Sequence, residues 1–155
     1  MMEIKAGFSG SKGFTLIELI VAVVITGILA AAASSSYQIY VKRSNRTLAK
    51  AVLLENSQFM EQVYTVNNQY DATVGVDGVA NTVDDVAVIL PFAQSPKTGA
   101  ALQYAISLNA VTDTAFQLQA VPMGSMTGDV CGTLTLTSTG MQGATGGDAA
   151  GCWNR

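Results

Sequence analysis

Few side chains in this 155-residue sequence could do chemistry. Glu18 is a carboxylate inside an otherwise uncharged apolar run, residues 14–33, and Cys131 and Cys152 could form a disulfide. A loop between residues 71 and 101 carries oxygen atoms in principle suited to calcium, on Asp77, Asn81, Asp84 and Asp85. Their order does not match the EF-hand loop. A calcium site in this loop therefore stays an open alternative, and we expect no metal or cofactor.

The sequence lacks the side chains and spacings on which enzymes most commonly depend. Histidine is absent, which removes the commonest general base and every histidine-dependent triad. The string Gly-Ser-Met-Thr-Gly at residues 124–128 places its serine one position too early for a G-x-S-x-G nucleophile. The two cysteines lie too far apart for a C-x-x-C redox pair or a local zinc site. The sequence therefore argues against an enzyme, including a membrane-anchored one.

The charge balance is acidic and sparse. Charged residues make up 12% of the chain, apolar residues 49%, and the net charge is −3. The isoelectric point is about 4.7. After Lys50 only Lys97 and Arg155 are basic, so the C-terminal two thirds offer no basic surface to a phosphate backbone. This balance argues against a nucleic-acid partner.

The apolar run is long enough to cross a membrane. Twenty helical residues span about 30 Å, the thickness of a bilayer core. A signal peptide cut near Ala33 or a plain membrane anchor would both fit, and Lys5 and Lys12 supply the positive start that a signal peptide needs. Neither explains Glu18, because a carboxylate inside a spanning helix costs on the order of 3 kcal/mol.

The string KGFTLIEL at residues 12–19 resembles the processing site of type IV prepilins and the related pseudopilins. The resemblance implies that a prepilin peptidase cuts between Gly13 and Phe14, removes a leader of residues 1–13 and methylates Phe14. Glu18 would then pair with the Phe14 amine of a neighbouring subunit, where an unpaired charge is costly. The leader takes two of 8 basic and one of 11 acidic side chains with it, which leaves a net charge of −4.

Residues 15–67 are predicted to form one long helix, because no proline and only Gly27 interrupts them. Residues 14–36 would be its transmembrane and assembly half, and small residues recur there every four positions, at Ala22, Thr26, Ala30 and Ser34. The second half shows an apolar stripe of Val41, Leu48, Val52, Phe59, Val63 and Val66. Its basic residues are predicted to face lipid headgroups or acidic neighbours, or simply to form a solvated face: Lys42, Arg43, Arg46 and Lys50.

The C-terminal half is predicted to be a small antiparallel sheet. Apolar and polar residues alternate over residues 102–110 and 115–122, and again over residues 131–140, whose strand would open at Cys131. The run VAVILPF at residues 86–92 is expected to be buried. From Gly140 the tail has too few bulky side chains for a core of its own. A helix packed on such a sheet makes an α+β fold.

The C-terminal region carries a second resemblance. An export segment at the front favours a disulfide, and Cys131 and Cys152 resemble the pair that closes the C-terminal loop of type IV pilins. The strings CGTLTLTSTG and CW are similar to the tails of PilE-type minor pilins. A bridge would close a loop of about 22 residues and stabilise the domain by roughly 3 kcal/mol. The resemblance implies a pilin fold with a globular domain over residues 37–155.

The function implied is structural: a type IV pilus subunit, of the minor class, with roles in twitching motility, adhesion or DNA uptake. The implied partners are other pilin subunits, the prepilin peptidase and N-methyltransferase, the inner-membrane assembly machinery and the membrane. The chain would lie in the inner membrane, with its domain periplasmic, and then in the extracellular pilus. A type II secretion pseudopilin and a DNA-binding competence pilin are the alternatives.

Overall fold

The computed structural model describes residues 13–79, 81–99 and 101–154. All of the expected leader except Gly13 lies outside these residues. The chain divides into two compact units at Ile39, and the helix α1, Leu16–Asn67, runs through both of them. This helix confirms the predicted boundaries within one residue, as expected for a segment that contains one glycine and no proline.

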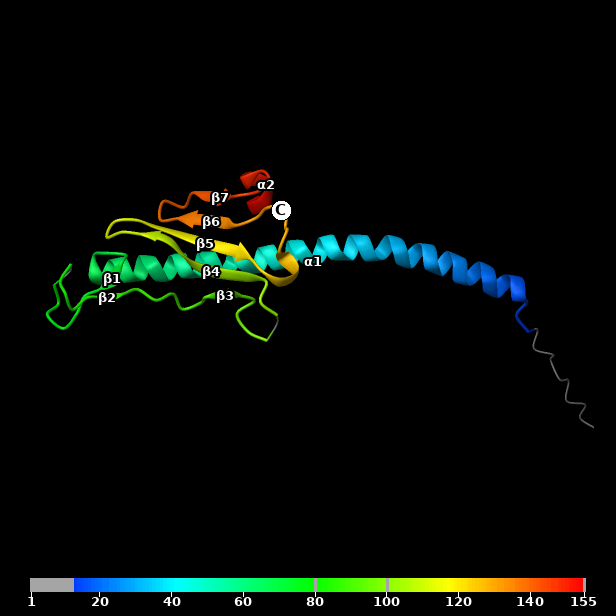
Figure 1. Ribbon diagram of the computed structural model, residues 1–155, viewed down its shortest axis with the longest axis horizontal. Coiled ribbons are helices and arrows are strands. Elements are labelled where there is room, and N and C mark those ends of the chain that lie inside the picture. Colours follow the sequence, from blue (N-terminus) through cyan, green and yellow to red (C-terminus); the bar gives the residue numbers. More distant parts are fainter. Residues whose placement is uncertain (1–12, 80, 100, 155) are drawn as a thin grey trace, which may run out of the picture. The chain divides into compact units, whose positions relative to one another are not determined.

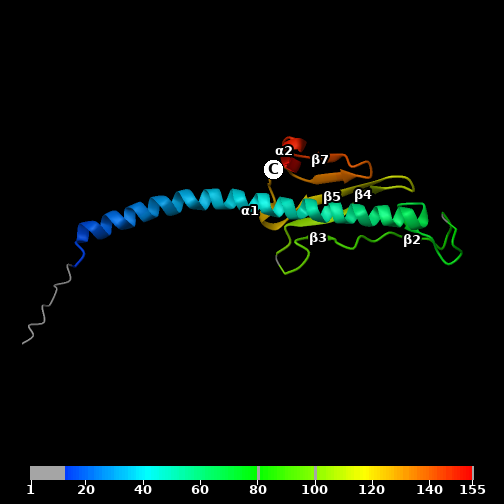
Figure 2. The same ribbon diagram turned by 180° about the vertical axis from the view of Figure 1, so that it is seen from behind.

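The second unit, from Tyr40 onward, is an antiparallel sheet with α1 on one face (Figures 1 and 2). The sheet has five strands in sequence order: β3 Gln94–Ser95, β4 Tyr104–Val111, β5 Phe116–Pro122, β6 Leu134–Thr137 and β7 Gln142–Ala144. A separate hairpin pairs β1 Ala72–Thr73 with β2 Val86–Ala87. A short 3₁₀ helix, Gly124–Met126, follows β5, and the helix α2, Ala149–Asn154, ends the chain. These elements confirm the predicted α+β architecture.

The alternation predicted for the three main strands is correct except at Leu102, which precedes β4 and is exposed. Its apolar members enter the core, and the fully buried ones are Tyr104, Ile106, Phe116, Leu118, Ala120, Leu134 and Leu136. The register places Ile106 opposite Ala120 and Ala120 opposite Leu134, so one face of the meander is continuous and apolar. The opposite face carries uncharged polar side chains such as Gln119, which donates to the Ser107 hydroxyl over 3.1 Å.

The predicted apolar stripe of α1 is partly wrong. Val52 and Val63 are buried, but Leu48 and Val66 are exposed, Val66 to 74%. The face that packs on the sheet follows alternating spacings of three and four residues and includes three polar side chains: Arg46, Ala49, Leu53, Asn56, Met60, Val63 and Asn67. A reading based on hydrophobicity alone misses such a face.

Two further expectations are corrected in the sheet region. Residues 86–92 are not a buried run, because Val86 and Ile89 are exposed and only alternate residues pack half-buried against the core. Cys131 does not open a strand: it lies in a turn, three residues before β6 begins at Leu134. The glycine-rich tail also contributes the fifth strand, β7, which the sequence does not suggest.

Candidate functional site

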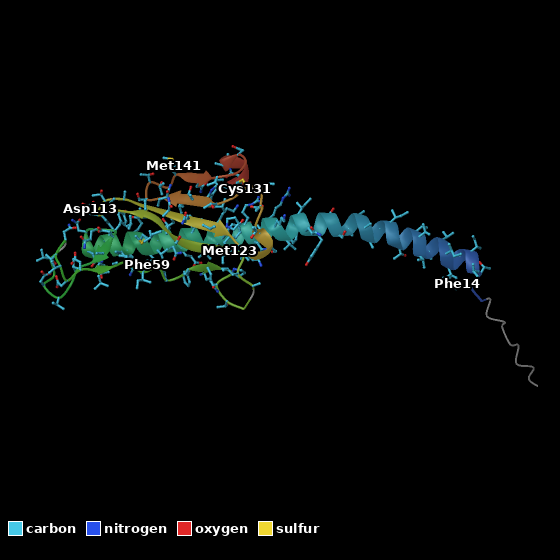
Figure 3. The ribbon with its side chains drawn as sticks, viewed as in Figure 1. Phe14, Phe59, Asp113, Met123, Cys131 and Met141 are labelled. Carbon is cyan, nitrogen blue, oxygen red and sulfur yellow. A yellow bond between two sulfur atoms is a disulfide. The ribbon has the colours of Figure 1, made fainter. Side chains whose placement is uncertain are left out.

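The start of α1 carries the residues predicted to be processed and to direct assembly (Figure 3 labels Phe14). Gly13 and Phe14 precede the helix and are exposed, Phe14 to 83%. Glu18 lies in the first turn. Its Oε2 accepts hydrogen bonds from the Thr15 backbone N–H at 3.1 Å and from the Thr15 hydroxyl at 3.0 Å. The Thr15 Oγ1 in turn accepts a 3.4 Å hydrogen bond from the Glu18 N–H.

Thr15 and Glu18 therefore form a capping box, in which each side chain satisfies a backbone N–H of the other residue. This gives Glu18 a local partner that the sequence interpretation missed. The signal was present in the sequence as Thr-Leu-Ile-Glu, the S/T-x-x-E pattern of a helix start. The carboxylate thus has a role within its own chain before any contact with a neighbour.

Replacing Thr15 by valine is expected to destabilise the first turn of α1 by about 1 kcal/mol, because the capping hydroxyl is lost. Thr15→Ser keeps the hydroxyl and is the matched control. The measurement is amide hydrogen exchange of residues 16–19 in detergent micelles, where valine should speed exchange about fivefold. Equal exchange in both variants would show that the capping box does not hold this turn.

After Glu18, the first half of α1 is mainly apolar up to Ala33, and the helix carries no further charge until Lys42. Its most hydrophobic 18-residue window has a mean hydropathy of 2.6, and none of it is buried within the chain, so it is long and apolar enough to cross a membrane. Two hydroxyls on the small-residue face bond to their own helix: Thr26 donates to the Ala22 carbonyl at 2.7 Å and Ser34 to the Ala31 carbonyl at 3.0 Å. Ala22, Thr26 and Ala30 line a shallow apolar groove with Leu19, Val23 and Gly27. Such a face lets another helix approach closely.

The basic residues that follow are not one solvated face, contrary to expectation. Arg46 is buried, and its guanidinium makes a bidentate contact with Asp129, with NH2 to Oδ1 at 2.6 Å and Nε to Oδ2 at 3.2 Å. The Tyr104 hydroxyl also donates to Asp129 Oδ2 at 3.2 Å. Burial, and then the Asp129 charge, raise the pKa of Tyr104. Arg46, Tyr104 and Asp129 bring α1, β4 and the loop after β5 together, and no local sequence signal indicates this cluster.

The C-terminal region confirms the predicted disulfide. Cys131 and Cys152 are bonded, with a Cα–Cα distance of 5.8 Å, and Figure 3 shows Cys131 beside α2. Trp153 is buried against the sheet, and its indole N–H donates to the Gly143 carbonyl at 2.9 Å. Lys50 Nζ donates to the Trp153 carbonyl at 2.8 Å, so this basic residue also anchors the tail. Burial, and then the charge of Arg46, lower the pKa of Lys50.

The loop considered for calcium, described at residues 74–79 and 81–85, is organised by hydrogen bonds to its own carboxylates. Asp85 accepts from Gln69 Nε2 at 2.9 Å, from the Gly75 N–H at 3.1 Å and from the Asn81 N–H at 2.7 Å. Asp84 accepts from the Thr82 hydroxyl at 2.6 Å. Within the described residues no three acidic, histidine or cysteine side chains converge on a metal position. These carboxylates therefore shape the loop by accepting hydrogen bonds.

Comparison with known proteins gives matches along most of the chain. Residues 35–135 match the family model described as "Type IV minor pilin ComP, DNA uptake sequence receptor", and residues 7–34 match the "Prokaryotic N-terminal methylation motif". The Eikenella corrodens fimbrial protein EcpC is 38% identical over 73 residues, covering 47% of this chain and 48% of that protein. A Neisseria meningitidis fimbrial protein is 37% identical over 75 residues, covering 47% and 43%. The matches thus span about half the length of these relatives.

Solved structures are similar at lower identity. The Neisseria meningitidis minor pilin PilV is 21% identical, with a TM-score of 0.47 over 70% of this chain and 91% of that one. A type IV pilin from Shewanella oneidensis is 23% identical, with a TM-score of 0.43 over 74% and 99%. The family model, by contrast, covers well over half of the chain and takes in the second part of α1, strands β1 to β5, the start of β6 and Cys131. The methylation motif and the membrane-length part of α1 precede this match. The chain belongs to the ComP family of type IV minor pilins.

Proposed function

We propose that this pilin is cut between Gly13 and Phe14, methylated on the new Phe14 amine and assembled through the first half of α1. The leader is then residues 1–13, the membrane and assembly segment residues 14–36, and the globular domain residues 37–155. One observation carries the proposal: Glu18 is the single charged residue between Phe14 and Val41, and it sits five positions after Gly13. The methylation motif matched over residues 7–34 supports the same cut.

The geometry of the first turn supports a role for Glu18 in assembly. Cleavage creates a cationic amine at Phe14, next to Thr15 and one turn from Glu18. Glu18 Oε2 already accepts two hydrogen bonds from Thr15, so the carboxylate is held at the start of the helix. In the low dielectric of a membrane or filament, the amine of a neighbouring subunit is a strong partner for it. The partners that we propose for the chain are neighbouring pilin subunits, the prepilin peptidase and the inner-membrane assembly machinery.

The decisive experiment is the intact mass and N-terminal residue of the chain recovered from sheared filaments. A chain that begins at Phe14 and is one methyl group heavier than the unmodified sequence supports the proposal. A chain that begins near Ser34 would mean removal of an ordinary signal peptide, with no assembly role for Glu18. A chain that retains Met1 would leave a plain membrane anchor.

Replacing Glu18 by alanine is expected to leave cleavage intact but to lower the amount of this subunit in sheared filaments by more than about tenfold. A tenfold loss corresponds to about 1.4 kcal/mol, less than the usual effect of breaking a buried ion pair. Quantitative immunoblots of filament and membrane fractions measure the ratio. Ile25→Val, on the same helix but outside the groove lined by Ala22, Thr26 and Ala30, is the control and should be incorporated normally. Normal incorporation of Glu18→Ala would contradict the pairing.

DNA binding is a second candidate function, favoured by the family model over residues 35–135. Among the described residues, few basic side chains are available to contact DNA. Arg46 is buried against Asp129, Lys50 holds the Trp153 carbonyl, and Lys97 pairs with Glu55. Lys42 and Arg43 are exposed. With two phosphate contacts the logarithm of affinity would fall with the logarithm of salt concentration at a slope of about −2. Titrating filaments with labelled duplex DNA at several salt concentrations tests this.

A further inference from the structure

The first part of the globular unit's helix is basic, and two of its four charges are used inside the domain. Residues 40–50 contain four basic and no acidic side chains. Arg46 is buried against Asp129, and Lys50 donates to the Trp153 carbonyl. Both contacts hold other parts of the domain to α1, so the folding of the domain accounts for these two cations.

The other two cations are exposed on the same stretch of helix. Lys42 and Arg43 are adjacent, and among the residues that the structure describes neither takes part in an ion pair. Tyr40 is 71% exposed and precedes Arg43 by three positions, so their side chains are neighbours on one face of the helix. We call Tyr40, Lys42 and Arg43 the basic turn; it lies in the cyan part of α1 in Figure 1.

The basic turn follows closely on the apolar run of α1. Lys42 comes nine residues after Ala33, where the run ends, which is about 14 Å at 1.5 Å per residue. The headgroups of a bilayer extend about 5–7 Å beyond each side of the hydrocarbon core. Lysine and arginine side chains are long and can reach back toward such a surface. When residues 14–33 fill the core, both cations therefore lie within a Debye length, about 8 Å, of the lipid phosphates.

Elsewhere the charge of the domain opposes contact with phosphate groups. After Lys50 the described residues carry one basic side chain, Lys97, and it pairs with Glu55. On α1 the nearest carboxylate without an ion pair is Glu61, 18 residues after Arg43. That is about 27 Å along the helix, more than three Debye lengths, so Glu61 does not weaken an attraction at the basic turn. The basic turn is therefore the part of the described domain that best fits an anionic surface.

We infer that the basic turn binds the phosphate groups of anionic phospholipids on the side of the membrane that faces the globular unit, before the subunit enters a filament. The occupant is a lipid surface rather than DNA, because the helix that carries both cations continues from a membrane-length segment. Basic residues beside a spanning helix attract anionic lipids, and tyrosine is favoured at the membrane interface.

This contact goes beyond the proposed function, since it requires neither the cut after Gly13 nor the pairing of Glu18. It also has a consequence for assembly. A subunit that enters a filament must release these lipids, so the basic turn favours retention of the subunit in the membrane.

The test uses the full-length chain in phosphatidylcholine proteoliposomes that contain traces of spin-labelled lipid. Electron spin resonance distinguishes lipid that contacts the protein, whose motion is restricted, from free lipid. Spin-labelled phosphatidylglycerol should associate with the protein at least about threefold more strongly than spin-labelled phosphatidylcholine. Raising the ionic strength to about 1 M should remove most of this enrichment, since the Debye length falls to about 3 Å.

Substitutions assign the enrichment to the basic turn. Lys42→Gln with Arg43→Gln should make the two lipids associate equally, and Arg43→Gln alone should remove part of the enrichment. Lys97→Gln is the matched control for the single variant and should change nothing, because it removes a cation that is paired with Glu55. Trp153 fluorescence should be the same in all variants, since the substituted side chains are not buried.

The other outcomes overturn the inference. Equal association of the two lipids with the parent chain would do so whatever the variants show. Enrichment that survives the double substitution, or that Lys97→Gln reduces as much as Arg43→Gln does, would place the lipid contact elsewhere. Loss of duplex DNA binding to filaments on the double substitution, without lipid enrichment in the parent chain, would assign Lys42 and Arg43 to DNA.

Discussion

Replacing Asp129 by alanine is expected to lower the free energy of unfolding by about 3–5 kcal/mol, because the buried guanidinium of Arg46 then loses its only ion-pair partner among the described residues. The Tyr104 hydroxyl loses its acceptor in the same step. Urea unfolding in detergent measures the change, and Trp153, the only tryptophan of the chain, reports it by fluorescence. The midpoint should fall while the m-value stays the same.

A matched variant separates the free-energy cost of leaving Arg46 buried without a partner from the net contribution of the Arg46–Asp129 pair to stability. Arg46→Met combined with Asp129→Leu removes both charges and keeps apolar bulk, so it should be much less destabilised than Asp129→Ala. Asp129→Ala unfolding within about 0.5 kcal/mol of the parent chain would show that solvent reaches Arg46. The raised pKa of Tyr104 gives a pH signature, because its contribution is complete below its unfolded value of about 10 and declines above it.

Removing the disulfide with Cys131→Ala and Cys152→Ala is expected to cost about 3 kcal/mol, since the bridge closes a loop between residues 21 positions apart. Local effects should be larger than this number suggests. The tail after Gly140 contains few bulky side chains, and the bond fixes α2, where Trp153 and its contact to Lys50 lie. Tryptophan fluorescence should shift to longer wavelength, and proteases should cut between residues 138 and 150.

The parent chain treated with a reducing agent provides the control for this variant. It should show the same red shift and the same cleavage pattern, because it loses the bond without losing either side chain. A variant that keeps the parent's protease resistance would mean that the Trp153 contacts alone hold the tail. The hydrogen bond from its indole to the Gly143 carbonyl would then be the feature to remove next.

The elements of this fold were largely predictable because their signals are local. The absence of proline, and of any glycine except Gly27, indicated one continuous helix for α1, and alternation indicated β4, β5 and β6. The disulfide was predictable from an export segment and a resemblance. At the candidate site, the Gly13, Phe14 and Glu18 assignments stay predictions, since processing and assembly involve molecules outside this chain.

The packing face of α1 was not predictable from local patterns. Asn56, which is fully buried, exchanges hydrogen bonds with the Phe92 backbone, 36 residues away. The partner of Arg46 is 83 residues away. Hydrophobic periodicity cannot identify a polar residue as buried when its partner comes from a remote loop. Strand β7 was not predictable from its own residues either, because it contains Gly143. This glycine lies opposite Thr135, where a side chain would collide with the threonine hydroxyl.

The three buried polar residues of α1 also bear on mechanics. Arg46 is held by Asp129, Asn56 by the Phe92 backbone, and Asn67 accepts from the Val74 N–H at 3.1 Å. An apolar face could slide by one turn and find similar contacts, but a slide here would break all three attachments together. In a fibre under tension the pull enters each domain through α1 along its axis. The rest of the domain is therefore attached to α1 at three separate positions along the helix, and these attachments together resist sliding of the helix along its axis.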